Sequence, residues 1–193
     1  MRFFGGMAVL LAGTSAWASD AAQAPKRVVR ACMNPGANAS MMYRGQGTAT
    51  QILKQAGIRL DWRTDERACT EGNGIVVTVS RETPVNQHSG ALAYAMPYER
   101  THIVLLYDRV LNAAGPAVAP SLLGHVLAHE IVHMLQGVNV HSASGVMKAH
   151  WNSQDFADMQ RGRLKLTIDD IDLIDHGLGW RVTPPVQPNG QPQ

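Results

Sequence analysis

The chain has 193 residues, of which 45% are hydrophobic and 17% are charged, and its formal net charge is +2. This length suits one domain, and the apolar content is high enough to bury a core, which excludes a disordered chain. The basic residues are scattered along the sequence, so there is no electrostatic footprint of nucleic-acid binding and we expect no nucleic-acid partner.

The first residues have the features of an export signal. Arg2 precedes an apolar run over residues 3–12, and residues 16–18 (Ala-Trp-Ala) form a small-x-small cleavage pattern. We therefore expect a signal peptide over residues 1–18 and a secreted or periplasmic protein. The alternative is an uncleaved membrane anchor, for which the apolar run is short. No later segment is predicted to span a bilayer, so we expect no stable membrane insertion after cleavage.

Strands are predicted where β-branched or alternating apolar residues lie between turn signals. The clearest is Gly-Ile-Val-Val-Thr-Val-Ser over residues 74–80. In chain order, the first half predicts a strand over 27–32, a loop over 34–40, a helix over 48–55, and strands over 58–62, 74–80, 90–96 and 102–107.

Two helices are predicted in the second half, after a loop over residues 113–119. Pro120 suits a first helical turn and Gly137 suits the position just past a helix end, so the first helix is predicted to end at Gln136. Its apolar residues occur on all sides, which indicates a buried helix. The second is predicted over residues 167–176, with Thr167 as its N-cap.

The order of these elements predicts an α/β (α+β) domain over residues 19–183 with a mixed sheet and few helices. Residues 184–193 are rich in Pro, Gln, Asn and Gly, and they are predicted to be a disordered tail. No internal repeat is present.

The most informative stretch is His129-Glu130-Ile131-Val132-His133, inside the predicted buried helix. Residues four apart lie on one helix face, so the two imidazoles can converge on one cation. Zinc accepts imidazole nitrogen, and this spacing is the known signature of zinc peptidases in which the glutamate is the general base. The alternative is a polar face that hydrogen-bonds internally, although burying these groups without a purpose is costly.

A catalytic zinc ion needs a third protein ligand and an open position. No glutamate follows Glu130 in the sequence. This excludes the class of zinc peptidases in which a later glutamate is the third zinc ligand. His125 lies ~12 Å from His133 along the helix axis, too far for both to share one tetrahedral ion with His129.

The remaining donors lie downstream of the helix. His141 follows Gly137 by four residues, so the chain can turn back there and bring its imidazole to the metal. We therefore predict His141 as the third ligand. His150, or a downstream aspartate such as Asp155, is the alternative.

Together with the pentapeptide, Gly137, His141-Ser142 and Gly145-Val146-Met147 resemble the metzincin zinc metallopeptidases, and their matrixin-like branch most. The resemblance implies a mixed, mostly parallel sheet, a buried active-site helix and a C-terminal helix. It also implies that Met147 lies in a tight turn beneath the metal. The segment 90–97 is similar to the matrixin edge strand, which implies that the substrate lies along four residues, Ala91, Leu92, Ala93 and Tyr94.

This sequence departs from the family pattern in spacing. In the family, the glycine usually stands three residues after the second histidine, and the third histidine stands six residues after it. Here Gly137 stands four residues after His133, and His141 stands eight residues after it. Asn139 occupies the usual third-ligand position. Tyr94 replaces a histidine that helps to bind a structural zinc in matrixins, so we expect one catalytic Zn²⁺ and no second zinc. No tyrosine stands two residues after Met147, so the astacin-type extra ligand is missing.

The chain has two cysteines, Cys32 and Cys69, and in an exported protein such a pair most simply forms one disulfide. In metzincins the two strands that these cysteines follow are neighbours, so the resemblance brings both to one end of the sheet. The alternatives are two separate buried thiols, or a Cys32 thiolate that caps the zinc.

The resemblance implies a monomeric secreted zinc endopeptidase that acts on peptide or protein substrates. The competing hypotheses are a catalytically inactive exported zinc-binding interaction module and a metal-free structural domain. Trp151 is interpreted either as a wall of the active-site pocket or as a core residue.

Overall fold

A computed structural model describes residues 27–81, 90–162 and 164–182. The proposed signal peptide and the tail over residues 184–193 lie outside the described residues. In chain order the elements are β1 (Arg27–Met33), the 3₁₀ turn η1 (Gly36–Asn38), α1 (Ala39–Lys54), β2 (Ile58–Arg63), α2 (Arg67–Thr70), β3 (Ile75–Ser80), β4 (Ala93–Ala95), β5 (His102–Leu106), α3 (Tyr107–Gln136), α4 (Ser153–Gln160) and α5 (Ile168–Val182).

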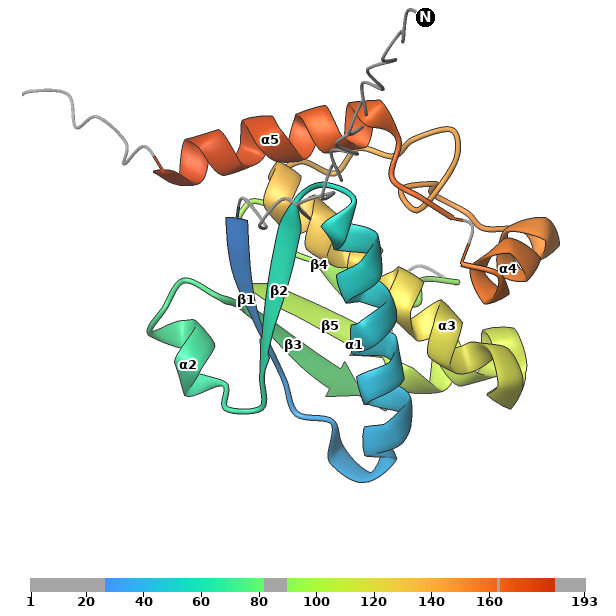
Figure 1. Cartoon of the computed structure of the whole chain (residues 1–193). Coiled ribbons are helices and arrows are strands. Elements are labelled where there is room, and N and C mark those ends of the chain that lie inside the picture. The colour runs from blue at the N-terminus through green and yellow to red at the C-terminus, as the bar shows by residue number, and fades with distance from the viewer. Residues whose placement is uncertain (1–26, 82–89, 163, 183–193) are drawn as a thin grey trace, which may run out of the picture.

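The strands form one five-stranded sheet in the order β2-β1-β3-β5-β4 (Figure 1). Strands β2, β1, β3 and β5 run parallel, whereas β4 pairs antiparallel with β5 at the edge. The connection from β4 to β5 is short, which suits an antiparallel pair, and the β1–β2 connection contains α1, as a parallel pair requires. The prediction of an α/β fold with a mostly parallel sheet is confirmed.

The period-two pattern of the strands gives the sheet two different faces. Ile75 and Val77 of β3 belong to the main hydrophobic core, which they share with α1, α3 and α5, whereas Val76 packs with the two cysteines in a small second cluster. The long helices therefore gather on one face of the sheet, and the short α2 lies on the side of the second cluster.

Helix α3 begins earlier than the sequence predicted, and this corrects two boundaries. It starts at Tyr107, which the prediction gave to the preceding strand, and it continues through the predicted loop over residues 113–119. Within that loop only Gly115 leaves helical geometry (φ 67°, ψ 169°), and Pro116 follows it directly. One glycine–proline break thus interrupts the helix locally, while buried Val110 fixes the turn before it to the core.

By length and hydropathy alone, α3 could cross a membrane, contrary to the prediction that no later segment would qualify. A core helix has the same composition. Every residue from 122 to 136 is buried, against the sheet and the other helices of the described chain. In this fold α3 is the central core helix, and it supplies the first two histidines of the site.

Helix α1 is also longer than predicted, because small residues conceal its buried face. It starts at Ala39, inside the predicted 34–40 loop, and buries Met42, Gly45 and Ala49 at helical spacing. A β-carbon on Gly124 of α3 would meet Thr48 Cγ2 at 2.7 Å and the Gly45 carbonyl oxygen at 2.8 Å. The glycines therefore let the two helices approach closely, which sets the position of α3 over the sheet.

Three further differences concern the short and C-terminal helices. Helices α2 and α4 were not predicted because they are short, with 4 and 8 residues. Helix α5 continues past Gly177 to Val182 instead of ending at residue 176. Gly177 is needed there for packing, because a β-carbon would lie 2.6 Å from the Gln136 carbonyl oxygen at the end of α3.

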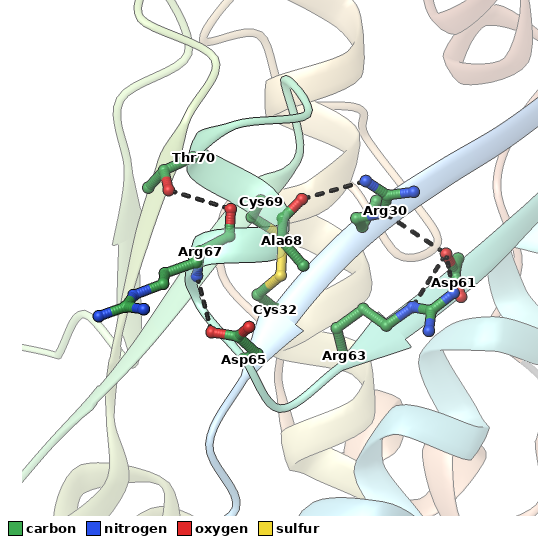
Figure 2. Close-up of a disulfide and its surroundings, with 9 residues drawn as sticks. All are labelled: Arg30, Cys32, Asp61, Arg63, Asp65, Arg67, Ala68, Cys69 and Thr70. Carbon is green, nitrogen blue, oxygen red and sulfur yellow. Dashed lines mark hydrogen bonds and ion pairs between the residues drawn. A yellow bond between two sulfur atoms is a disulfide. The ribbon is translucent and has the colours of Figure 1, made fainter.

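The predicted disulfide joins Cys32 at the end of β1 to Cys69 of α2 (Figure 2). Because both sulfur atoms are in this bond, the alternatives of two separate buried thiols and of a zinc-capping Cys32 are excluded in this structure. Beside the bridge, the Arg30 guanidinium donates to the Ala68 carbonyl oxygen at 3.1 Å and reaches the Asp61 carboxylate at 3.5 Å. The disulfide and Arg30 thus hold α2 against the neighbouring strands β1 and β2.

The close crossing of α1 and α3 generates a stability prediction. Gly124→Ala should lower the free energy of unfolding by about 1–3 kcal/mol, because the methyl group has no room against α1. Gly47→Ala, on the exposed face of α1 with no atom near its β-carbon, is the matched control and should raise it by about 0.5–1 kcal/mol. Urea denaturation of both variants measures the two shifts, and equal effects would contradict the tight crossing.

The disulfide generates a second stability prediction. It joins residues 37 positions apart, and in the chain-entropy model such a loop stabilises the fold by about 3–4 kcal/mol. Adding a reductant should therefore lower the thermal midpoint of the wild-type protein. The double variant Cys32→Ala/Cys69→Ala should be less stable from the start and insensitive to the reductant. A wild-type midpoint that does not respond to full reduction would contradict this role.

Candidate metal centre

Three histidine side chains converge at one point beside helix α3. His129 and His133 lie one turn apart on α3 and are 8% and 4% exposed, whereas His141 is an exposed residue of the following segment. The Nε2 atom of His133 lies 3.1 Å from Nε2 of His129 and 3.3 Å from Nε2 of His141. The three possible ligand atoms all lie within 4.8 Å of one another.

Backbone carbonyl groups fix which nitrogen carries the proton in the two buried rings. Nδ1 of His129 lies 2.9 Å from the Val146 oxygen, and Nδ1 of His133 lies 3.1 Å from the Val138 oxygen. A carbonyl oxygen only accepts, so Nδ1 is the donor and Nε2 keeps its lone pair. Burial lowers the pKa of His129 to about 4 and that of His133 to about 3, so both rings are neutral near pH 7.

This arrangement fits a zinc ion. Neutral imidazoles with converging Nε2 lone pairs repel one another unless a proton or a cation lies between them. Tetrahedral zinc with nitrogen ligands at ~2.0–2.1 Å needs its donors roughly 3.3 Å apart, which agrees with the two short separations around His133. The carbonyl groups that orient the rings are the kind of outer contact that fixes the tautomer of metal-binding histidines.

The chain reaches His141 through the turn predicted at Gly137. Gly137 has left-handed geometry (φ 72°), and its N–H donates to the His133 carbonyl oxygen at 2.8 Å, which ends α3. The chain then returns along the same end of the helix and brings His141 beside the other two rings. The predicted set of three histidines is therefore brought together, and their role as zinc ligands stays a prediction.

The alternative donors lie outside this group of three. The Asp155 carboxylate accepts from Lys148 Nζ at 2.6 Å and from the Asn152 N–H at 2.7 Å, so it is engaged in capping α4. His125 directs Nδ1 to the Ser121 oxygen, and it is not part of the group. His150 is exposed and is not part of the group either.

Glu130 borders the same cleft from α3. It is 9% exposed, and burial raises the pKa of its carboxyl group to about 7. A cation beside it would favour the carboxylate form. The carboxylate is the form that accepts a proton, as its predicted role as a general base requires.

The predicted methionine turn follows His141. Gly145 has left-handed geometry (φ 77°), the Val146 N–H donates to the Lys165 oxygen at 2.9 Å, and the Ser142 N–H donates to the Met147 oxygen at 2.8 Å. Met147 is fully buried in the main core. Because the Val146 carbonyl oxygen also holds His129, the turn is linked directly to one of the three histidines.

The site opens into a cleft of about 490 Å³. Strand β4 is shorter than the predicted 90–96: it contains Ala93 and Tyr94, whereas Ala91 and Leu92 precede it. Gly90 has a positive φ of 101°, yet Leu92 still accepts from the Leu106 N–H at 2.9 Å, so this stretch runs beside β5. The cleft is lined by residues 90–95 and 148–151 and by Pro97, Ala113, Val126, His129, Glu130, His133, Asn139, His141 and Phe156.

Besides Tyr94, the aromatic residues Trp151 and Phe156 form part of the cleft wall. Trp151 presents its ring edge-on to His129 with 5.5 Å between ring centroids, which favours the wall interpretation of this residue. Phe156 was not identified from the sequence because helix α4 was missed. The signal was present: Asn152 and Asp155, three residues apart, form a reciprocal capping box that marks the start of α4.

Comparisons with known proteins give a distant match. No protein-family model and no curated protein matches the chain. Among solved structures, it is similar to the crystal structure of archaemetzincin from Methanopyrus kandleri, with 14% sequence identity and a TM-score of 0.49. The similarity covers 79% of this chain and 95% of that one. At this distance no activity is transferred from it.

The convergence of the three histidines generates a metal-binding prediction. Wild-type protein loaded with zinc should retain about one ion per chain, as one catalytic site holds. His129→Ala, His133→Ala and His141→Ala should each weaken zinc binding by more than the ~10–100-fold typical of changes outside the ligand set. His176→Ala, at an exposed position of α5, is the control and should bind zinc like the wild type.

Zinc content by elemental analysis and affinity by competition with a chelator measure these effects. If His141→Ala binds zinc as tightly as the wild type, then His141 is not a ligand.

Proposed function

We propose that this chain is an exported zinc-dependent endopeptidase, with His129, His133 and His141 as the zinc ligands and Glu130 as the general base. The observation that carries the proposal is the convergence of three imidazole Nε2 atoms beside a buried glutamate in an open cleft. Three protein ligands and an open fourth position characterise catalytic zinc sites, whereas structural sites are closed by four protein ligands.

When bound, a zinc ion supplies Lewis acidity, which lowers the pKa of a water ligand toward ~7 and polarises a carbonyl group. Glu130 takes a proton from the attacking water and passes it to the amine that leaves when the peptide bond breaks. His129 and His133 keep their Nδ1–H bonds to Val146 and Val138 throughout, so that the ligands do not rotate. Met147 is proposed to be the buried methionine of the tight turn that lies beneath the zinc ion.

The substrate is proposed to be an extended peptide segment. Within the described chain β4 is an edge strand, bonded to β5 on one side, and the cleft borders Ala93 and Tyr94. An extended chain can add to such an edge through main-chain hydrogen bonds, which are independent of side-chain identity. This mode suits cleavage within a polypeptide, because the cleft needs neither terminus of the substrate.

Export is proposed from two features. The N-terminal residues match a signal peptide, and the Cys32–Cys69 disulfide is typical of proteins in oxidising compartments.

Glu130→Gln tests the proposed mechanism. The amide cannot accept the water proton, so the rate of hydrolysis should fall by ~10²–10⁴-fold, the usual contribution of general acid–base catalysis. Zinc content should remain that of the wild type, because Glu130 is not a proposed ligand. Cleavage of an unfolded casein-type substrate is followed by mass spectrometry of the products. Glu71→Gln, at an exposed position outside the cleft, is the control and should retain activity.

Two results would contradict the proposal in different ways. Full activity of the Glu130→Gln variant would reject the assigned base. Wild-type protein that binds zinc and cleaves no unfolded substrate would instead favour the inactive zinc-binding interaction module.

A further inference from the structure

The segment that carries the third histidine has little packing of its own. Residues 138–142, which we call the His141 loop, contain three consecutive exposed residues, and Val140 is 51% exposed. An apolar side chain that stays exposed contributes little to fixing a loop. Nevertheless, the loop places Nε2 of His141 within 3.3 Å of Nε2 of His133. Contacts at the two ends of the loop must therefore hold it.

The C-terminal end of the loop is held by Asp170. The Ser142 hydroxyl donates to Oδ1 of Asp170 at 2.5 Å, and the Thr167 N–H donates to Oδ2 at 2.8 Å. Asp170 is only 2% exposed and lies in the first turn of α5, where the helix dipole stabilises a negative charge. A buried carboxylate with fixed partners is a rigid anchor for the residue next to His141.

Arg100, from the turn between β4 and β5, lies beside the N-terminal end of the loop, where the His133 ring bonds the Val138 carbonyl oxygen. Its guanidinium donates to the Gly177 carbonyl oxygen at 2.9 Å and lies over Gly137, where a β-carbon would come within 2.5 Å of Cζ. Arg100 adopts a positive φ of 56°, which is uncommon for a residue with a side chain. The side chain thus fills the space beside the point at which the chain leaves α3.

Both anchors depend on one face of helix α5. Asp170, Ile174 and Gly177 are four and three residues apart, so they lie on the same side of the helix. Ile174 is fully buried in the main core, and Gly177 packs against the Gln136 carbonyl oxygen at the end of α3. Docking of α5 on α3 therefore fixes the start and the end of the His141 loop together.

We propose that Asp170 and Arg100 are positioning residues that hold the His141 loop against α5, so that the imidazole of His141 is already in place when a metal ion binds. The inference rests on the proposed zinc site. Its physical basis is preorganisation: an anchored loop does not have to be ordered by the metal, so that less of the binding energy is lost.

The first arm of the test compares two adjacent aspartates. Ser142→Ala, Arg100→Gln and Asp170→Asn should each weaken zinc affinity by ~10–100-fold, the range observed for changes outside the ligand set. Asp169→Asn removes the same charge from the same turn of α5 at an exposed position, and its zinc affinity should be unchanged. Affinity is measured by competition with a chelator, and the cobalt(II) absorption spectrum reports the coordination geometry.

The second arm asks whether the effect passes through His141. In a His141→Ala background, Ser142→Ala and Arg100→Gln should change zinc affinity by less than about twofold, because the ligand they position is gone. A general loss of structure would instead weaken affinity equally in both backgrounds. Ser142→Ala removes only a half-buried hydroxyl, so it keeps the test decisive if Asp170→Asn does not fold.

Equal losses in the two backgrounds, or wild-type affinity in Ser142→Ala, would overturn the positioning role while leaving the zinc site intact. Wild-type protein that binds no zinc would overturn both this inference and the proposed function. All these measurements use metal binding, so they do not depend on peptidase activity.

Discussion

The site depends on the burial of a polar triplet, His129, Glu130 and His133, in a helix that is otherwise apolar. Burial keeps the imidazoles neutral and raises the pKa of the glutamate. Backbone carbonyl groups take the Nδ1 protons, which leaves lone pairs directed at a common point. Without a cation this arrangement is unfavourable, and with one it becomes a preorganised ligand set.

The remainder of the fold fixes where that helix lies. The close contact of Gly124 with α1 sets the position of α3 over the sheet. The edge strand β4 of the same sheet lines the cleft. Helix α5 then closes over the end of α3, where Gly177 permits direct contact with the backbone. The helix that carries two of the histidines is thus fixed on three sides.

Two of the errors of sequence-based prediction concern glycines. The start of α1 was missed because small residues such as Gly45 conceal its buried face, and the stretch predicted as a loop before residue 120 contains Gly115 and Pro116. In the structure Gly45 allows close helix packing, and the Gly115 break interrupts α3 only locally. A glycine used for contact and a glycine used for a turn are identical in sequence, since the difference lies in a neighbour that is distant along the chain.

The sequence by itself determined the features that depend on local spacing: the strands, the buried helix, and the pair His129 and His133 with Glu130 between them. These follow from the periods of helix and strand, which need no knowledge of the fold. Only the tertiary structure decided among His141, His150 and Asp155 for the third member of the group, and only it revealed the Phe156 wall and the Arg100 anchor. Those depend on contacts between residues far apart in sequence, which become defined when the helices pack on the sheet.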